Sequence, residues 1–258
     1  WYITKGLAPL EICYCHTPPR WLYGYPTSVN FQKYWPVRWY GIIVGHFLRM
    51  YDFKQALKVD IFVANSQEVA ARIKKFYRRE ATVIYPPVEI STPKAVVRKD
   101  YFLVLSRMVG GKGVELAVEA ASKKGFKLKI AGEAAGFGGL NNVETLGYIS
   151  ETEKAKLMAE AKGFLALEEA PDFGITPVES MMTGTPVIAF NGGGYKESVV
   201  DGKTGVLFDD YSVAGLISAI ERFNKMKWDR KFIQLWAKRF SRRMFVDKIT
   251  ELVKTLKI

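Results

Sequence analysis

The second half of the chain alternates short apolar runs with amphipathic stretches, and this alternation limits most strongly how the chain can fold. Helix candidates lie between the runs, and Ser150 followed by Glu153 is typical of a helix N-terminus. Strands that alternate with helices form parallel sheets, so we expect a doubly wound α/β domain that binds ligands at the carboxyl ends of its strands. The runs predict strands at residues 101–106, 128–131, 143–146, 164–167, 187–190 and 206–208.

The first part of the chain repeats this pattern less completely. A helix is predicted at residues 66–77, with Asn65 at its N-terminus and Glu68 behind it. The run Tyr85-Pro86-Pro87-Val88 is stiff and incompatible with a helix, as in an interdomain linker. Strands are predicted at residues 11–15, 60–64 and 82–85.

We therefore expect two domains, because 258 residues exceed a typical single domain of about 100–200 residues. The first comprises residues 1–90 and the second residues 91–258, which end in a basic helical tail. The chain opens at Trp1 without a domain's usual first strand and Gly-rich loop. We expect the first domain to lack its start.

Charge, cysteine content and hydropathy restrict the partners and the location. A net charge of +12 implies affinity for an anionic partner. The sequence has neither a run of about 18 uncharged apolar residues nor a basic-then-apolar leader. The only cysteines, Cys13 and Cys15, alternate on a predicted strand and face one side of it. These features predict a cytoplasmic protein.

Residues 31–57 interleave aromatic and basic side chains, among them Trp39, Phe47, Arg49 and Lys54. One interpretation is a helix lying on an anionic membrane, and another is a platform for single-stranded nucleic acid. A third is an amphipathic helix with its aromatic residues in the core.

Two segments carry residue types suited to an anionic ligand. Residues 106–113 follow the first strand of the second domain, where Gly110 and Gly111 allow close backbone approach and Arg107 and Lys112 supply positive charge. The spacing matches neither a P-loop nor a dinucleotide fingerprint. Residues 172–180 include Gly174 before a helix, which leaves amides free, and Glu179 inside it, a candidate acceptor for ribose hydroxyls.

Two further segments are weaker signals. Gly192-Gly193-Gly194 predicts either a phosphate-facing turn or a flexible connector. His16 ends a strand of the first domain, where either a structural or a catalytic role is open. No group of His, Cys, Asp and Glu has metal-ligand spacing.

Together these segments resemble the retaining glycosyltransferases of family four, whose GT-B architecture has two Rossmann-like domains. The resemblance covers residues 12–223. His16-Thr17-Pro18 and Ala64-Asn65-Ser66 further resemble the mannosyltransferase-like branch that builds surface glycans. The main motifs are Ser-Arg-Met-Val-x-x-Lys-Gly from Ser106, Phe-Gly-Ile-Thr-Pro-Val-Glu-Ser from Phe173, Gly-Thr-Pro-Val-Ile-Ala from Gly184 and Asp-Gly-Lys-Thr-Gly from Asp201.

The resemblance implies a site for a nucleotide-sugar donor, without a metal or other cofactor. Arg107 and Lys112 would hold the diphosphate and Glu179 the ribose, and His16 would face the transferred sugar. The leaving phosphate would accept the proton of the acceptor hydroxyl. Further donor contacts are implied for Gly110, Gly111, Asp172, Phe173, Gly174, Ile175 and Thr176.

One position departs from the family pattern of two glutamates separated by seven residues. Counting back from Glu179 leads to Pro171. Glu169 or Glu168 would replace the missing carboxylate if Ala170-Pro171 is an insertion, and Asp172 would do so less well. The predicted catalytic residues are thus His16, Arg107, Lys112 and Glu169.

The resulting hypothesis is transfer of a hexose, mannose favoured, from a nucleotide-sugar to a lipid-linked or glycan acceptor with retention. GDP-mannose is the favoured donor and a UDP-hexose the alternative. Other hypotheses are a nucleotide-sugar-binding remnant without turnover, an epimerase or phosphorylase of the same fold, and a nucleic-acid-binding protein. We expect no nucleic acid as partner, and a peripheral contact with the inner face of the membrane.

Overall fold

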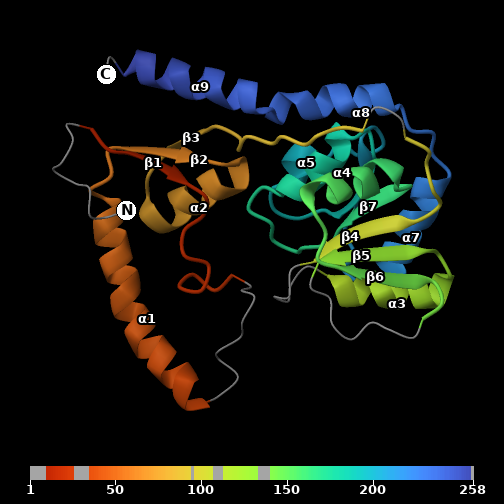
Figure 1. The fold of residues 1–258 in the computed structure, drawn as a ribbon. Helices are drawn as coiled ribbons and strands as arrows, with labels where there is room; N and C mark the ends of the chain where they lie inside the picture. Colours follow the sequence, from red (N-terminus) through yellow and green to blue (C-terminus); the bar gives the residue numbers. More distant parts are fainter. Residues whose placement is uncertain (1–9, 26–34, 94–95, 107–112, 133–139, 257–258) are drawn as a thin grey trace. The chain divides into compact units, whose positions relative to one another are not determined.

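The computed structural model describes residues 10–25, 35–93, 96–106, 113–132 and 140–256 (Figure 1). The chain divides into two compact units, Trp1–Tyr85 and Pro86–Ile258. No helix in the described ranges is both long enough and apolar enough to cross a membrane.

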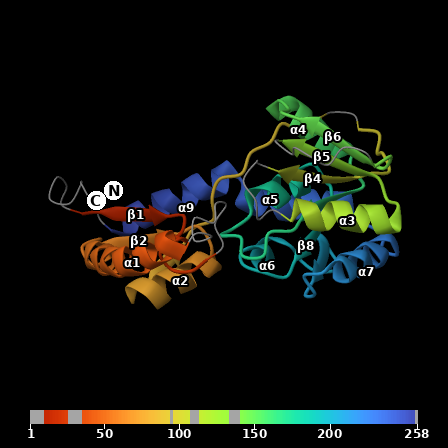
Figure 2. The ribbon, with the colours of Figure 1, turned by 90° about the horizontal axis from the view of Figure 1, so that it is seen from below.

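The first unit contains, in its described part, a parallel sheet of three strands in the order β1-β2-β3. Its helices are α1 (Trp35–Ala56) and α2 (Gln67–Tyr77) (Figure 2). All three predicted strands and the predicted helix at 66–77 are confirmed, with bounds that shift by one or two residues. The strands are β1 (Ile12–Cys15), β2 (Ile61–Ala64) and β3 (Ala81–Val83).

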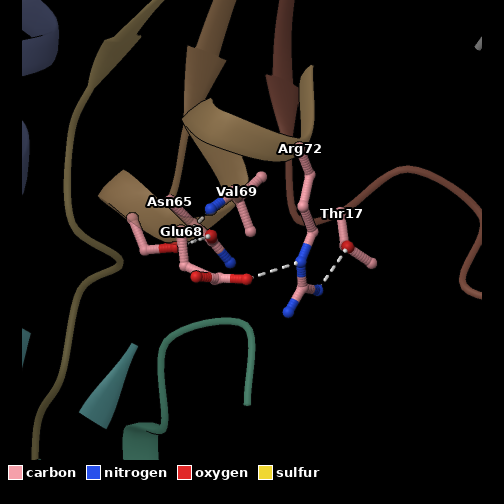
Figure 3. Close-up of polar contacts among 6 residues, drawn as sticks. Thr17, Asn65, Glu68, Val69 and Arg72 are labelled. Atoms are coloured by element: carbon pink, nitrogen blue, oxygen red, sulfur yellow. Dashed lines mark hydrogen bonds and ion pairs between the residues drawn. The ribbon is translucent and has the colours of Figure 1, made fainter. Parts of the chain in front are cut away.

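The start of α2 differs from the prediction by one residue. Ser66, not Asn65, is the N-cap, and its hydroxyl oxygen accepts a hydrogen bond from the amide of Val69 at 3.0 Å. The Asn65 amide still donates to the carbonyl of Cys15, so Asn65 continues the strand pairing and cannot open the helix. Its side-chain oxygen accepts from the Ser66 hydroxyl (Figure 3).

Three aromatic residues of helix α1 lie outside any core. Trp39, Phe47 and Tyr51 are 62%, 64% and 55% exposed. Asp52 and Ala56 are buried and mark the side of α1 that packs on the rest of the unit. The interpretation of an amphipathic helix with buried aromatic residues is therefore wrong for these three.

The second unit is built, within the described residues, on a parallel sheet of six strands in the order β6-β5-β4-β7-β8-β9. All six strands predicted from the apolar runs are confirmed. They are β4 (Phe102–Ser106), β5 (Leu128–Gly132), β6 (Val143–Gly147), β7 (Gly163–Ala166), β8 (Val187–Phe190) and β9 (Gly205–Phe208).

Helices cover both faces of this sheet (Figures 1 and 2). Helices α3 (Val114–Lys124) and α7 (Val213–Asn224) pack together on one face, and α4 (Glu151–Glu160) and α5 (Ile175–Met182) on the other. The predicted cap at Ser150 is confirmed, because its hydroxyl accepts from the Glu153 amide at 3.1 Å. The central strands β7 and β8 are thus buried on both sides, which explains their continuous apolar runs.

The strand order creates a switch point between β4 and β7. From β4 the chain moves outward through β5 and β6, and it then returns to β7 and proceeds through β8 and β9 in the opposite direction. Connections after neighbouring strands therefore diverge at the carboxyl ends of β4 and β7. A doubly wound sheet opens a crevice for ligands at this point.

The C-terminal part of the second unit binds the segment around Val88, with which that unit begins. Helix α8 (Arg230–Ala237) packs on α5, and the Trp236 indole donates to the Ser198 carbonyl at 2.8 Å. Beyond it follows α9 (Arg242–Thr255). The Val88 amide donates to the Phe240 carbonyl at 2.9 Å, and Val88 is buried. The segment around Val88 is thereby fixed to the second unit.

Candidate functional site

The segments that follow β4 and β7 are in direct contact at the switch point. Gly113, which precedes α3, has a φ of +69° and lies against Leu167. The Tyr211 hydroxyl donates to the Leu167 carbonyl at 2.8 Å, and burial raises the pKa of Tyr211 to about 12. Because Tyr211 keeps its proton at neutral pH, this bond holds the end of β7 next to the start of α3.

Four predicted site residues, Arg107, Gly110, Gly111 and Lys112, lie in residues 107–112, outside the described part of the chain. The residues on either side of this segment are described. Ser106 ends β4 and Gly113 precedes α3. These two flanking residues lie at the switch point, and the roles of residues 107–112 stay predictions.

Helix α5 begins at the same edge of the sheet without a side-chain cap. Its N-cap is Gly174 at φ +89°, which has no side chain to bond the first-turn amides of Ile175 and Thr176. A β-carbon on Gly174 would lie 2.3 Å from the Tyr195 ring, so a larger residue does not fit. An uncapped helix N-terminus attracts anions through its amides and its dipole.

The glycine triplet after β8 supports the segment that precedes α5. A β-carbon on Gly192 would lie 2.1 Å from the carbonyl oxygen of Glu169, and one on Gly193 would lie 2.2 Å from that of Pro171. The Gly194 amide donates to the same Pro171 carbonyl at 2.9 Å. The interpretation of this triplet as a flexible connector is therefore wrong, since protein backbone packs directly against the glycines, whereas a phosphate-facing turn stays a prediction.

The supported segment carries the candidate carboxylates of the site. Glu169 is exposed, whereas Glu168 and Asp172 are half-buried. Phe173 is buried, and its ring lies 5.4 Å from that of Phe240. Phe173 can therefore offer a ligand only its backbone, and its side chain anchors the segment to the unit.

Glu179, in the second turn of α5, is the most distinctive polar group of the site. Its carboxylate is buried, with Oε1 2.9 Å from Nζ of Lys154 on α4. Oε2 is also buried and has no hydrogen-bond partner among the described residues. Burial raises the pKa of Glu179, against the lowering effect of Lys154. Glu179 is therefore not a solvated helix carboxylate.

In the first unit, polar side chains gather at the carboxyl ends of β1 and β2 (Figure 3). The buried Arg72 on α2 donates to Thr17 Oγ1 at 3.1 Å and to Glu68 Oε1 at 3.1 Å. Its guanidinium also lies 4.2 Å from the centre of the Tyr25 ring. These contacts fix the turn next to His16, which is exposed.

Arg72 and Lys154 did not stand out in the sequence as site residues. Arg72 follows Glu68 by four residues on a predicted helix, and this spacing could have predicted their ion pair. Lys154 and Glu179 are 25 residues apart, and no local pattern connects them. In the described ranges, no three residues among His, Cys, Asp and Glu are grouped so as to hold a metal ion.

The fold and this site define a class of protein before any comparison. A parallel sheet with this strand order, a helix with a glycine N-cap and a buried carboxylate near its switch point is typical of a doubly wound nucleotide-binding unit. The chain belongs to the family described as glycosyl transferases group 1, whose profile matches residues 89–252.

Individual relatives agree with this assignment. An uncharacterized glycosyltransferase of Methanocaldococcus jannaschii is 26% identical over 208 residues, which are 77% of this chain and 59% of the relative. An alpha-1,3/1,6-mannosyltransferase of Dictyostelium discoideum is 34% identical over 128 residues, 48% of this chain and 30% of the relative. The chain thus spans only part of the length of the relatives it matches.

Solved structures show the same fold. Anabaena HepE in complex with UDP and glucose matches with a TM-score of 0.67 and 20% identity, over 80% of this chain and 66% of that one. The apo galactosyltransferase WaaB of the lipopolysaccharide outer core matches with a TM-score of 0.66 and 18% identity, over 77% of this chain and 63% of that one. The predicted α/β fold of GT-B type is confirmed.

Proposed function

We propose that this protein is a retaining glycosyltransferase that moves a hexose from a nucleotide-sugar to an acceptor hydroxyl. The observation that carries the proposal is the buried carboxylate of Glu179, whose Oε2 is unpartnered among the described residues. A buried acceptor without a partner is costly unless a ligand supplies a donor. Membership of the glycosyl transferases group 1 supports a nucleotide-sugar as that ligand.

Each part of the donor has a candidate partner. Arg107 and Lys112, with Gly110 and Gly111 between them, would bind the diphosphate and stabilise the charge that develops on it as the sugar departs. Glu179 would accept hydrogen bonds from the ribose. The amides of Ile175 and Thr176, at the glycine-capped start of α5, would bind the diphosphate or sugar.

The remaining candidates concern the sugar itself. Glu169 and Glu168, on the segment against which the glycine triplet packs, are the first two candidates to contact the hexose. Asp172 is the third carboxylate there. His16 belongs to the first unit and would contact the transferred sugar. These four roles follow from the family resemblance.

The donor proposed first is GDP-mannose, because several curated relatives are named mannosyltransferases. A UDP-hexose is the second choice, since the HepE structure holds UDP and glucose. The proposed acceptor is a glycan or a lipid-linked sugar.

Calorimetric titration with GDP-mannose, GDP, UDP-glucose and UDP tests this function. The wild type should bind one nucleotide series, and Lys112→Ala should weaken that binding at least about tenfold by losing a charged diphosphate contact. Incubation with the bound donor and product analysis then separate transfer from epimerisation or phosphorolysis. Binding without turnover would favour a nucleotide-sugar-binding remnant, and a folded protein that binds none of the four would overturn the proposal.

The proposal includes a peripheral contact of α1 with an anionic membrane surface. Exposed apolar side chains recur along α1 at Trp39, Ile43, Phe47 and Met50, three or four residues apart. Such a stripe with cations beside it suits the interface of an anionic bilayer. Lys54 is exposed, and the sole acidic residue of α1, Asp52, is turned inward, where it accepts hydrogen bonds from Tyr23 and Tyr77.

A further inference from the structure

Lys154 and Glu179 form an ion pair between two neighbouring helices of the second unit. Nζ of Lys154 on α4 lies 2.9 Å from Oε1 of Glu179 on α5, and the two side chains are only 14% and 10% exposed. Lys154 also contacts Glu151 at 2.6 Å, but the Glu151 side chain is 86% exposed. Glu179 is thus the buried partner of this lysine.

The two carboxylate oxygens of Glu179 are used differently. Oε1 accepts the hydrogen bond from Lys154, whereas Oε2 is buried without a partner among the described residues. A carboxylate has room for about four donors, and a buried one is costly when they are missing. The ion pair therefore fixes the orientation of the carboxylate and leaves Oε2 able to accept a hydrogen bond from a ligand.

Lys154 also favours the charged form of this carboxylate, against the effect of burial. A buried carboxyl group without a cation nearby tends to take up a proton and becomes a weaker acceptor. Among the described residues, the charged groups that act on Glu179 are Lys154 and Glu151, both on α4. Lys154 is thus the one cation among them, and the orientation and charge of Glu179 depend on it.

We propose that Lys154 is a positioning residue for ribose recognition, which binds Oε1 of Glu179 and presents Oε2 to a ribose hydroxyl of the nucleotide. This inference rests on the proposed function. The hydroxyl donates its proton to a charged acceptor, and such bonds are among the stronger hydrogen bonds in proteins. Lys154 itself does not touch the nucleotide.

The test compares dissociation constants for GDP and 2′-deoxy-GDP, and for UDP and 2′-deoxy-UDP. A hydrogen bond to a charged group predicts that the wild type prefers the ribonucleotide by about tenfold or more. Lys154→Met should reduce that preference to about twofold or less, whereas Lys154→Arg should retain most of it. The same comparison with 3′-deoxy nucleotides identifies which hydroxyl is bound.

Lys156→Met is the matched control, because Lys156 is exposed on the same helix and loses the same charge. It should keep the full preference. In the Glu179→Gln background, Lys154→Met should change the preference no further, because the lysine acts through Glu179. Should Lys154→Met fail to fold, Lys154→Gln, which keeps a donor, carries the same comparison.

The outcomes separate this inference from the proposed function. A wild type that binds no nucleotide overturns the proposed function. A wild type that binds ribo- and deoxynucleotides equally overturns the assignment of Glu179 to the ribose, and the inference with it. A Lys154→Met variant that keeps the wild-type preference overturns the role of Lys154 alone.

Discussion

Gly113 and Leu167 are in contact where the segments after β4 and β7 meet, and a β-carbon on Gly113 would lie 2.5 Å from the Leu167 β-carbon. It would also lie 2.7 Å from the Leu167 carbonyl oxygen and 2.9 Å from the Tyr211 hydroxyl. Backbone and a hydrogen-bonded tyrosine cannot move aside easily. The contact ties the start of α3 to the end of β7 at the switch point.

Gly113→Ala should therefore destabilise the second unit and weaken nucleotide binding. The combination of positive φ and overpacking predicts a loss of about 2–4 kcal/mol in the free energy of unfolding. Gly125→Ala is the control, because Gly125 has a similar φ of +77° and nothing within 4 Å of the added carbon. Urea unfolding should show a loss of only about 1 kcal/mol for that control. Equal losses in the two variants would contradict the contact.

Arg98 should stabilise the second unit through two hydrogen bonds to backbone carbonyls, and not only through its charge. Its guanidinium donates to the carbonyls of Ala161 and Gly184, both at 2.6 Å, just after the ends of α4 and α5. Arg98→Met leaves both acceptors without this donor, and we expect a loss of about 1.5–3 kcal/mol in unfolding free energy.

Lys99→Met is the matched control for Arg98, since it removes the same charge from the next residue. Its ion pair with Glu160 is on the surface, with the Lys99 side chain 55% exposed. Such a pair contributes about 0–1 kcal/mol. If urea unfolding shows that Lys99→Met costs as much as Arg98→Met, the two carbonyl contacts are not the source of the effect.

The central strands of the six-stranded sheet could be predicted from the sequence because they are buried on both faces. A continuous apolar run, such as residues 187–190, has no other simple interpretation between two helical stretches, and β8 occupies the same residues. The cap of α2 was misplaced, since Asn65 and Ser66 are both good caps and only pairing with Cys15 decides between them.

Features that depend on contacts distant in sequence could not be predicted. A glycine in the sequence shows only that a side chain is missing. It does not show what fills that space, so the packing of Gly193 on Pro171 could not be predicted. The pairing of Lys154 with Glu179 requires α4 to lie beside α5. The periodicity of α1 likewise does not say which of its faces is buried, and Trp39 proved exposed.

The stability of the second unit should depend on pH through Glu179. Burial raises the pKa of Glu179 above the ordinary value of 4.5, so the folded protein keeps this proton at pH values where the unfolded chain has lost it. The free energy of unfolding then falls as pH rises through that interval. In Glu179→Gln this titration is absent.

The stability of Glu179→Gln relative to the wild type should thus increase as pH rises from about 4.5 towards neutrality. Urea unfolding of both proteins at several pH values measures the difference directly. Glu153→Gln, which removes an exposed carboxyl from α4, should show no such trend. A difference that moves in favour of the wild type would mean that Lys154 stabilises the charged carboxylate more than burial opposes it.

Binding to anionic vesicles should depend on the exposed apolar stripe of α1. Phe47 is 64% exposed, and burial of a phenylalanine in a bilayer interface predicts that Phe47→Glu weakens binding about tenfold or more. Cosedimentation with vesicles of phosphatidylserine and phosphatidylcholine measures the affinity of both proteins for the bilayer. Binding to these vesicles should weaken when salt is added, and vesicles of phosphatidylcholine alone should bind less protein, because Lys54 and Lys58 contribute through charge. Leu235→Glu, at a residue 64% exposed on α8, should bind like the wild type. Equal losses in both variants, or a wild type that ignores anionic vesicles, would refute a membrane contact through α1.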